Sequence, residues 1–513
     1  MRKILREKGV GISRRAFLGK GGLMLGGLGL LGGLAASDFV GAAQAPPRPA
    51  PKAIDLLPWK ELRESLSGGV LRPGEGGYAK AAAPWNLRYA DRLPGGVARC
   101  RTPQDVIAAF SWADSANLPV AIRGGGHSSA GYSSCRGLQV DLTELNSVSY
   151  DPDSTLLTVG GGARFSQLRE ALEPHGRAVP MPCFEALGVA GTVLGGGLTL
   201  DMRRQGLLCD QLQSFELVTP RGDLFLCDRQ QHFDLFWAAR GAGGGQLGAI
   251  TSMVLKTFPA EELTYFDLAW DNDLEDLFPT LMALLPEGSE NLGAELCLRV
   301  KAGQAPRLEL RGQFVGDSQE LSDLLYPAFQ IAPPKEEAME SLPFWQAKAR
   351  LARTGQPVRQ AEKTRYLYSD LALPACDKIV ESLKAWPGTD GEARWTAYLL
   401  GKTVDNAGRR NTAYVHRGAK FLTLAGVTWG ANDAEPRVQA SLSWLEGLQQ
   451  ELERYGSTEC SQNWPDPDLE DFSNAYFGEN LSFLAAQRRV ADPDRVLRFE
   501  QTVRGANELL TST

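Results

Sequence analysis

Arg123-Gly124-Gly125-Gly126-His127 is the stretch that decides the fold of this chain. The six residues 118–123, Leu-Pro-Val-Ala-Ile-Arg, form a short apolar run that is typical of a buried strand. Three glycines after a strand let the backbone approach a flat ligand closely, because glycine tolerates positive φ and has no Cβ. The turn ends on one of only four histidines in the chain. Taken alone, the motif favours a tight turn followed by a hydrogen-bonded histidine.

Further motifs follow in a fixed order. A second glycine cluster covers 188–197, and a third covers 240–248. Near the end come Tyr476-Phe-Gly-Glu-Asn480 and Asp492-Pro-Asp-Arg-Val-Leu-Arg-Phe-Glu-Gln501. In this order and spacing the motifs resemble the berberine-bridge-enzyme-like branch of the vanillyl-alcohol-oxidase, or PCMH, flavoprotein family. The similarity extends from about Trp85 to Gln501.

The resemblance implies an α+β fold. It assigns 84–260 to a bipartite PCMH-type FAD-binding domain and 261–460 to a substrate domain with an antiparallel sheet backed by helices. The carboxy-terminal segment 461–513 is expected to return to the FAD domain. The positions that match the family's cofactor-binding positions are Arg123, Gly124, Gly125, Gly126, His127, Ser128, Cys183, Leu187, Gly188, Val189, Gly191, Thr192, Gly195, Gly196, Gly197, Tyr476 and Asn480.

Attachment of the flavin is a further implication of the resemblance. His127 occupies the position that bonds covalently to the 8α-methyl group of FAD. Many relatives add a second bond from a cysteine four residues before the first glycine of the loop that begins at Gly188. Phe184 stands at that position here, and Cys183 lies one residue further back. Attachment through His127 alone and attachment through both residues therefore remain alternatives.

The proton acceptor of the reaction is not obvious. Flavin oxidation of an alcohol or amine needs a base, and relatives supply a tyrosine or a glutamate. The family stretch Tyr-x-Asn-Tyr-Pro-Asp matches 461–466, where Ser461 and Trp464 replace both tyrosines. Tyr414 and His416 are the catalytic candidates, with Lys402 as a third. The favoured function is oxidation of a small organic substrate at an alcohol or sugar-like CH–OH group by hydride transfer to FAD; the alternative is a flavin-loaded binding or vestigial protein.

Leu187 concerns the molecule that accepts electrons from the reduced flavin. That acceptor is oxygen or another molecule. In plant members the residue immediately before the loop glycine gates oxygen, with valine leaving access and leucine obstructing it. Leu187 directly precedes Gly188. A single methylene can close such a path because protein interiors contain few voids larger than water. The resemblance thus favours a dehydrogenase.

Other nucleotide and metal sites are disfavoured. No Lys-Ser or Lys-Thr follows the glycine turns, so they do not form a nucleotide-hydrolysing P-loop. The stretch 243–248 satisfies G-x-G-x-x-G, but a helical segment precedes it and a strand-like one follows, the reverse of a Rossmann site. The eight cysteines form no CxxC pair, so we expect no metal.

Composition and the amino terminus indicate which partners the protein has and where it is located. The net charge of −7 gives no basic footprint for nucleic acid. Residues 1–45 read as a Tat signal peptide, with Arg14-Arg15 ahead of an apolar run at 21–36 that is short for a membrane span; an uncleaved anchor is the alternative. The Tat translocase is then a partner, and the location is the bacterial periplasm or the exterior. Residues 46–83 are expected to be a linker and amino-terminal extension.

Local patterns predict several elements. Helices are expected to begin at Thr102-Pro103 and Arg164, and near 377–385 and 437–455. Strands are expected at 137–142, 156–159, 294–300, 308–312 and 420–429, with a hairpin over 215–226.

Overall fold

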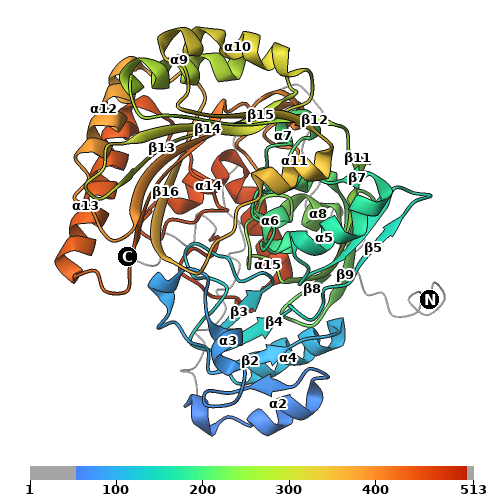
Figure 1. Cartoon of the computed structure of the whole chain (residues 1–513). Helices are drawn as coiled ribbons and strands as arrows, with labels where there is room; N and C mark the ends of the chain where they lie inside the picture. The colour runs from blue at the N-terminus through green and yellow to red at the C-terminus, as the bar shows by residue number, and fades with distance from the viewer. Residues whose placement is uncertain (1–52, 505–513) are drawn as a thin grey trace, which may run out of the picture. The chain divides into compact units, whose positions relative to one another are not determined.

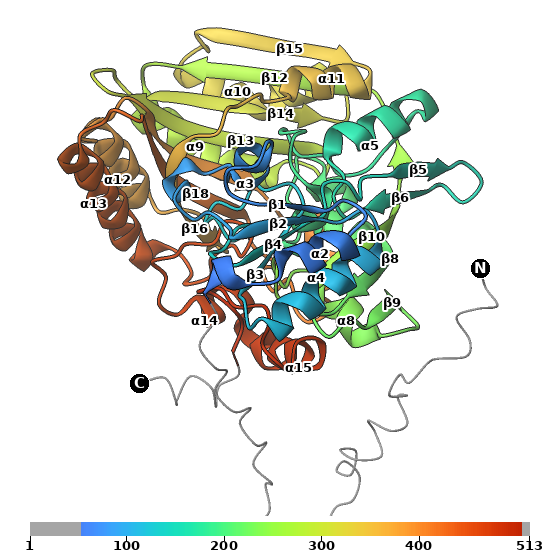
Figure 2. The same ribbon diagram turned by 90° about the horizontal axis from the view of Figure 1, so that it is seen from below.

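The computed structural model describes residues 53–504. Its first sheet has the order β1-β2-β4-β3, and β2, β4 and β3 run parallel. The strands are β1 (Val70–Leu71), β2 (Gly96–Arg99), β3 (Val120–Arg123) and β4 (Leu138–Asp141). Helices α2 (Trp59–Ser65), α3 (Tyr78–Ala82) and α4 (Pro103–Ser115) pack around them (Figure 2). Thr102 and Asp105 form a capping box at the start of α4, where the sequence predicts that a helix begins.

A second, antiparallel sheet completes the flavin-binding region. Its order is β5-β6-β10-β8-β9. The strands are β5 (Val148–Asp151), β6 (Leu156–Gly160), β8 (Leu212–Val218), β9 (Leu224–Asp228) and β10 (Ala249–Lys256). The accompanying elements are α5 (Phe165–Leu172), α6 (Val189–Leu194), α7 (Met202–Gln205), α8 (Phe233–Ala238) and the pair β7 (Arg177–Ala178) and β11 (Phe258–Pro259). Because α8 precedes the glycines at 243–248 and β10 follows them, this segment is not a Rossmann turn.

The third sheet is a seven-stranded antiparallel one with the order β15-β12-β14-β13-β17-β18-β16. Its strands are β12 (Leu263–Trp270), β13 (Leu292–Lys301), β14 (Arg307–Phe314), β15 (Glu336–Leu342), β16 (Arg359–Leu367), β17 (Glu392–Leu399) and β18 (Phe421–Trp429). Four helices cover one face (Figure 1), namely α9 (Leu274–Glu287), α10 (Ser318–Ile331), α12 (Leu373–Lys384) and α13 (Glu435–Leu452).

The two faces of this sheet differ in chemistry, because side chains alternate along each strand. Leu296 and Leu298 of β13 pack with the helices in the apolar core. Glu295 of β13 lies on the other face, directly opposite Tyr398 of β17 and Arg311 of β14. Helix α11 (Phe344–Leu351) contacts this second face, where Lys348 forms a buried ion pair with Asp201 of the flavin-binding region. The polar face of the sheet therefore faces the flavin-binding region.

The carboxy-terminal segment returns to the flavin-binding region. Helices α14 (Phe472–Phe477) and α15 (Leu481–Ala491) follow the large sheet, and α15 packs beside α8 (Figure 2). Leu497 forms a parallel bridge with Val120 of β3. The chain thus closes on the strand that leads into the first glycine turn.

The amino-terminal part of the described chain packs onto the first sheet. Residues 53–83 contribute α2, β1 and α3, and Val70 pairs with Ala98 of β2. Trp59 and Leu62 are buried in the core of the first sheet, which is the physical reason that this segment is ordered onto it. The expected Tat signal at 1–45 lies outside the described residues. Within 53–504, no helix combines the length and apolar character needed to cross a membrane.

Candidate active site

The first two glycine clusters meet backbone to backbone. A Cβ built on Gly125 would lie 2.3 Å from the amide nitrogen of Gly188. The next residue, Gly126, has a φ of +77°, in the left-handed region that favours glycine. Arg164 fastens the junction, since its guanidinium donates to the carbonyls of Gly125 and Ala186. The structure therefore brings together the two turns that the sequence analysis assigns to one ligand.

His127 presents one free ring nitrogen at this junction. Its Nδ1 lies 2.9 Å from the carbonyl oxygen of Gly125, and because a carbonyl only accepts, Nδ1 carries the proton. Its Nε2 is buried and has no hydrogen-bond partner within 53–504. Trp85 stacks on the ring at a centroid distance of 4.4 Å. Burial lowers the pKa of His127 to about 4, so the ring is neutral near pH 7 and Nε2 holds a lone pair.

Buried polar groups from the end of β3 to β4 lack a partner in the described part of the chain. They belong to one continuous stretch, and a buried polar group without a partner costs about 1–3 kcal/mol. FAD has the hydrogen-bonding oxygens and nitrogens that such groups require. The unpartnered atoms are Arg123 Nη1, His127 Nε2, Ser129 Oγ, Tyr132 Oη, Ser133 Oγ and Gln139 Oε1. The residues present therefore fit FAD.

The second glycine cluster has two parts with different roles. Gly191 is exposed, and a Cβ there would meet nothing within 4 Å. A Cβ on Gly195 would lie 2.2 Å from Oδ1 of Asn463, and one on Gly196 would lie 2.6 Å from the ring of Tyr414. Gly195 and Gly196 are therefore required for close packing against protein, and Gly191 is the glycine of this cluster left open to a ligand.

The remaining predicted positions in these turns serve the backbone around them. Leu187 is half-buried, and its carbonyl accepts from the amide of Phe165. The hydroxyl of Thr192 donates to the carbonyl of Gly188 at 2.9 Å, beside the buried Val189. Of the other positions in these turns, a Cβ built on Gly124 would lie 3.2 Å from the Gly161 carbonyl, the Oγ of Ser128 accepts from the Tyr132 amide, and Gly197 lies against Leu208.

Cys183 and Phe184 have different surroundings. The Phe184 ring lies 5.1 Å from the ring of Trp85 and 5.6 Å from that of His127. The carbonyl of Cys183 accepts from the amide of Arg353 at 2.6 Å, in the segment after α11. Burial raises the pKa of the Cys183 thiol to about 11, and Glu295 and Arg353 are its strongest charged neighbours. The structure thus places Phe184 beside His127 and surrounds the Cys183 thiol with charges of the substrate domain.

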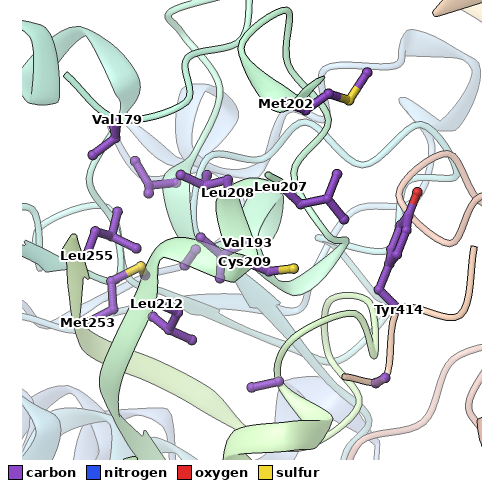
Figure 3. Packing of buried hydrophobic residues seen from close by; sticks show 14 of the residues in the cluster. Val179, Val193, Met202, Leu207, Leu208, Cys209, Leu212, Met253, Leu255 and Tyr414 are labelled. Carbon is purple, nitrogen blue, oxygen red and sulfur yellow. The ribbon is translucent and has the colours of Figure 1, made fainter. Parts of the chain in front are cut away.

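Tyr414 is packed into the protein core. It lies at one side of the buried cluster that contains Val193, Leu207 and Cys209 (Figure 3). Its hydroxyl is 2.9 Å from the hydroxyl of Tyr366, and its ring closes over Gly196. Within the described residues its polar atom is therefore satisfied by a neighbouring side chain.

His416 is equally enclosed. Its Nδ1 lies 2.7 Å from Glu459 Oε2 and its Nε2 lies 3.2 Å from Gln462 Oε1. Burial lowers the pKa of His416. Burial alone would raise the pKa of Glu459, but hydrogen bonds from His416 and Arg409 hold it at about 2. Both ring nitrogens are therefore used inside the fold, and the structure does not present His416 to a substrate.

Tyr476 and Asn480 hold the carboxy-terminal segment. The Tyr476 hydroxyl accepts from the amide of Asp466 at 2.8 Å and donates to Gln501 at 3.3 Å. Asn480 donates its side-chain amide to the carbonyls of Arg409 and Thr412. In the structure these two predicted cofactor contacts fix the segment that closes over the flavin-binding region.

One polar group on the large sheet was not expected from the sequence. Glu295 pairs with Arg353, and Tyr398 stands opposite Glu295. Trp464 stacks on Tyr398 at a centroid distance of 6.0 Å and an angle of 22°. A signal existed, because Arg394, Thr396 and Tyr398 alternate with apolar residues along β17.

Comparison with known proteins identifies the cofactor and the class of enzyme. A model of the FAD binding domain matches residues 94–228, and a model described as berberine and berberine like matches residues 462–504. The chain is an FAD-dependent oxidoreductase with the berberine-bridge-enzyme-like fold. FAD-linked oxidoreductase YgaK of Bacillus subtilis (strain 168) is 29% identical to it over 449 residues, covering 86% of this chain and 98% of YgaK.

Solved structures agree with this fold. BBE-like 1 of Physcomitrella patens matches the FAD-dependent oxidoreductase with a TM-score of 0.79 and 22% identity, covering 87% of this chain and 98% of the moss protein. Xylooligosaccharide oxidase from Myceliophthora thermophila C1 matches with a TM-score of 0.77 and 21% identity, covering 89% of this chain and all of the oxidase. The oxidoreductase thus spans nearly the full length of the solved proteins that it resembles.

Proposed function

We propose that this protein is an exported FAD-dependent oxidoreductase that holds its flavin covalently through His127 and oxidises a small, sugar-like substrate at a CH–OH group. The observation that carries the covalent bond is the neutral His127 ring with a buried, unpartnered Nε2 at the junction of the two glycine turns. Bound FAD would supply the acceptor for a hydride from the substrate carbon.

Attachment through His127 alone is the form that the contacts support. Phe184 lies beside His127 and has no nucleophilic atom. The neighbouring thiol of Cys183 is kept protonated by burial, and the thiolate is the reactive form of cysteine. Arg123, Gly191 and the hydroxyls of Ser129 and Ser133 are the groups left to hold the rest of FAD.

A sugar-like substrate suits the polar face of the large sheet. Its acids are matched by arginines, with Glu295 on Arg353 and Glu362 on Arg394. Such pairs offer both donors and acceptors without a net charge, as hydroxyl groups require. The likeness to xylooligosaccharide oxidase supports the same substrate class.

The electron acceptor and the location are part of the proposal. The half-buried Leu187 sits directly before Gly188 at the junction of the two turns, which supports an acceptor other than oxygen. The Arg14-Arg15 pair and the apolar run after it support export by the Tat translocase to the periplasm or beyond. Export of a folded enzyme also suits a cofactor that is bound before transport.

Acid precipitation of the purified holoenzyme tests the attachment. We expect FAD to remain with the precipitated chain and to fluoresce in a denaturing gel, and we expect His127→Ala to release it. His175→Ala is the matched control, because it removes an exposed histidine that is not one of the cofactor-binding positions. Yellow colour that washes out completely from the wild-type pellet would contradict covalent attachment.

Reduction of the bound flavin under anaerobic conditions tests the substrate class. We expect xylobiose or a related oligosaccharide to bleach the flavin absorbance. A flavin that no sugar or alcohol reduces would favour a binding or vestigial protein instead.

A further inference from the structure

Tyr398 stands on the polar face of the large sheet, above its centre. Along β17, Trp395 and Ala397 pack into the core under the helices. Tyr398 alternates with them and so projects from the opposite face. Its partners across the sheet are Glu295 of β13 and Leu422 of β18. Tyr398 is half-buried there, on the side that faces the flavin-binding region.

Trp464 brings the carboxy-terminal motif onto this ring. The two rings stack at 6.0 Å with an angle of 22°. In the stretch Ser461 to Asp466, relatives carry a tyrosine where this chain has Trp464, so the motif has lost its hydroxyl group. Tyr398, on which Trp464 stacks, carries a hydroxyl group.

We propose that Tyr398 is the proton acceptor of this oxidoreductase, and that its hydroxyl replaces the one missing from position 464. The assignment rests on the proposed oxidation of a CH–OH group. In the step, the substrate O–H bond breaks and its proton bonds to the phenolate oxygen of Tyr398. The C–H bond breaks with its electron pair leaving as hydride to the acceptor named above, and a carbonyl C=O bond forms.

A free hydroxyl distinguishes Tyr398 from Tyr366, Tyr414 and Tyr476. The hydroxyls of Tyr366 and Tyr414 bond to each other, and that of Tyr476 bonds to Asp466 and Gln501. Within 53–504, no group forms a hydrogen bond with the Tyr398 hydroxyl. This oxygen is also not one of the buried polar atoms that lack a partner. It is therefore open to a molecule that enters from the flavin side.

The charges around Tyr398 set the direction of its pH response. Burial is the main cause that raises the pKa of Tyr398, and Glu295 and Glu362 act in the same direction. Arg353 and Arg394 lower that pKa, and each arginine also pairs with one of the two acids. The phenol is thus the resting form at neutral pH. Because the phenolate is the form that accepts a proton, the rate of oxidation should rise with pH.

Stopped-flow reduction of the holoenzyme by xylobiose is the first test. We expect the logarithm of the reduction rate to rise with pH with a slope near one. Tyr398→Phe should remove this dependence and slow reduction about 100-fold or more, the range for loss of a general base. Trp464→Tyr in the Tyr398→Phe chain should restore much of the rate and its pH dependence. Tyr326→Phe, on the exposed face of α10, is the matched control.

Two results would overturn the assignment in that experiment. One is a Tyr398→Phe rate within about threefold of the wild type, well below the usual contribution of a base. The other is a pH dependence that persists in Tyr398→Phe. A double variant that stays as slow as Tyr398→Phe would overturn the replacement of the hydroxyl at position 464.

Fluorotyrosine labelling of the holoenzyme tests the site without turnover. The ¹⁹F resonance lost in Tyr398→Phe identifies this residue among the 12 tyrosines. We expect the pKa of the labelled Tyr398 to be higher than that of free fluorotyrosine. We expect it to be higher still in Arg353→Gln, because that change leaves Glu295 without its arginine. If xylobiose fails to reduce the wild type, the proposed sugar substrate is contradicted. The titration then tests the assignment of Tyr398 by itself. A midpoint that does not move in Arg353→Gln would overturn the assignment.

Discussion

At the scale of single residues, the side chains beside His127 decide how many bonds the flavin can receive. Phe184 and Trp85 enclose the imidazole, so the space next to its free Nε2 is aromatic. Cys183, one residue away, is surrounded by Glu295 and Arg353 instead. A difference of one position along the chain thus separates a thiol from the site where a second bond would form.

Exchanging Phe184 for a thiol tests this arrangement. We expect Phe184→Cys to acquire a second attachment, so that FAD stays bound after His127→Ala is added. Cys183→Ala should leave the absorption spectrum of the bound flavin unchanged, since its thiol faces the substrate domain. Denaturing electrophoresis with flavin fluorescence and visible spectra provide the measurements. A changed spectrum in Cys183→Ala would show that Cys183, not His127 alone, bonds the ring.

At the scale of elements, a buried ion pair joins the large sheet to the flavin-binding region. Lys348 of α11 donates to both oxygens of Asp201 and to Gln313 of β14, each at 2.8 Å. Asp201 also accepts from the amide of Met181, two residues before Cys183. Side chains from α11, β14 and the segment before α7 therefore meet around one carboxylate.

Removing one partner of this pair should destabilise the fold. We expect Lys348→Met to cost roughly 3–5 kcal/mol, because it leaves the Asp201 carboxylate buried without a cation. Adding Asp201→Asn should recover part of that loss. Urea unfolding followed by tryptophan fluorescence gives the comparison. Lys60→Met, in an exposed pair with Glu64, should change stability by less than about 1 kcal/mol; an equal effect from both lysines would contradict the argument.

Elements with a clear local pattern could be predicted from the sequence. Helix α4 has its capping box and β13 and β18 have apolar runs, so these were expected near their observed positions. Strand β17 was not expected, although its arginine, threonine and tyrosine alternate with apolar residues, because it has no continuous apolar run. The pairing of Arg353 with Glu295 joins an irregular segment to a strand, and only tertiary folding brings them together. For the same reason Tyr398 was not foreseen, and the enclosure of Tyr414 and His416 could not be read from their local sequence.

At the scale of the whole molecule, one polar network joins Glu459, near the end of the substrate domain, to residues far from it in the sequence. Glu459 accepts hydrogen bonds from His416, Arg409 and Tyr368. These hydrogen bonds outweigh burial and hold the pKa of Glu459 at about 2, below its usual value of 4.5. Burial also lowers the pKa of His416. In both groups the unfolded chain binds protons more readily than the folded chain does.

The sign of this linkage predicts how acid affects the fold. A lowered folded-state pKa gives stability that is fully present above the unfolded pKa and is lost as the pH falls. For Glu459 the loss should run from about pH 4.5 down to about pH 2 and amount to roughly 3 kcal/mol. His416 adds a loss in the same direction that begins below about pH 6.5. Urea midpoints of the holoenzyme at a series of pH values measure both effects. We expect Glu459→Gln to be less stable at pH 7 and to show a flatter decline below pH 4.5, whereas Glu64→Gln on the exposed helix α2 should follow the wild-type curve. An acid decline in Glu459→Gln as steep as in the wild type would mean that another carboxylate controls it, since the glutamine has no proton to gain.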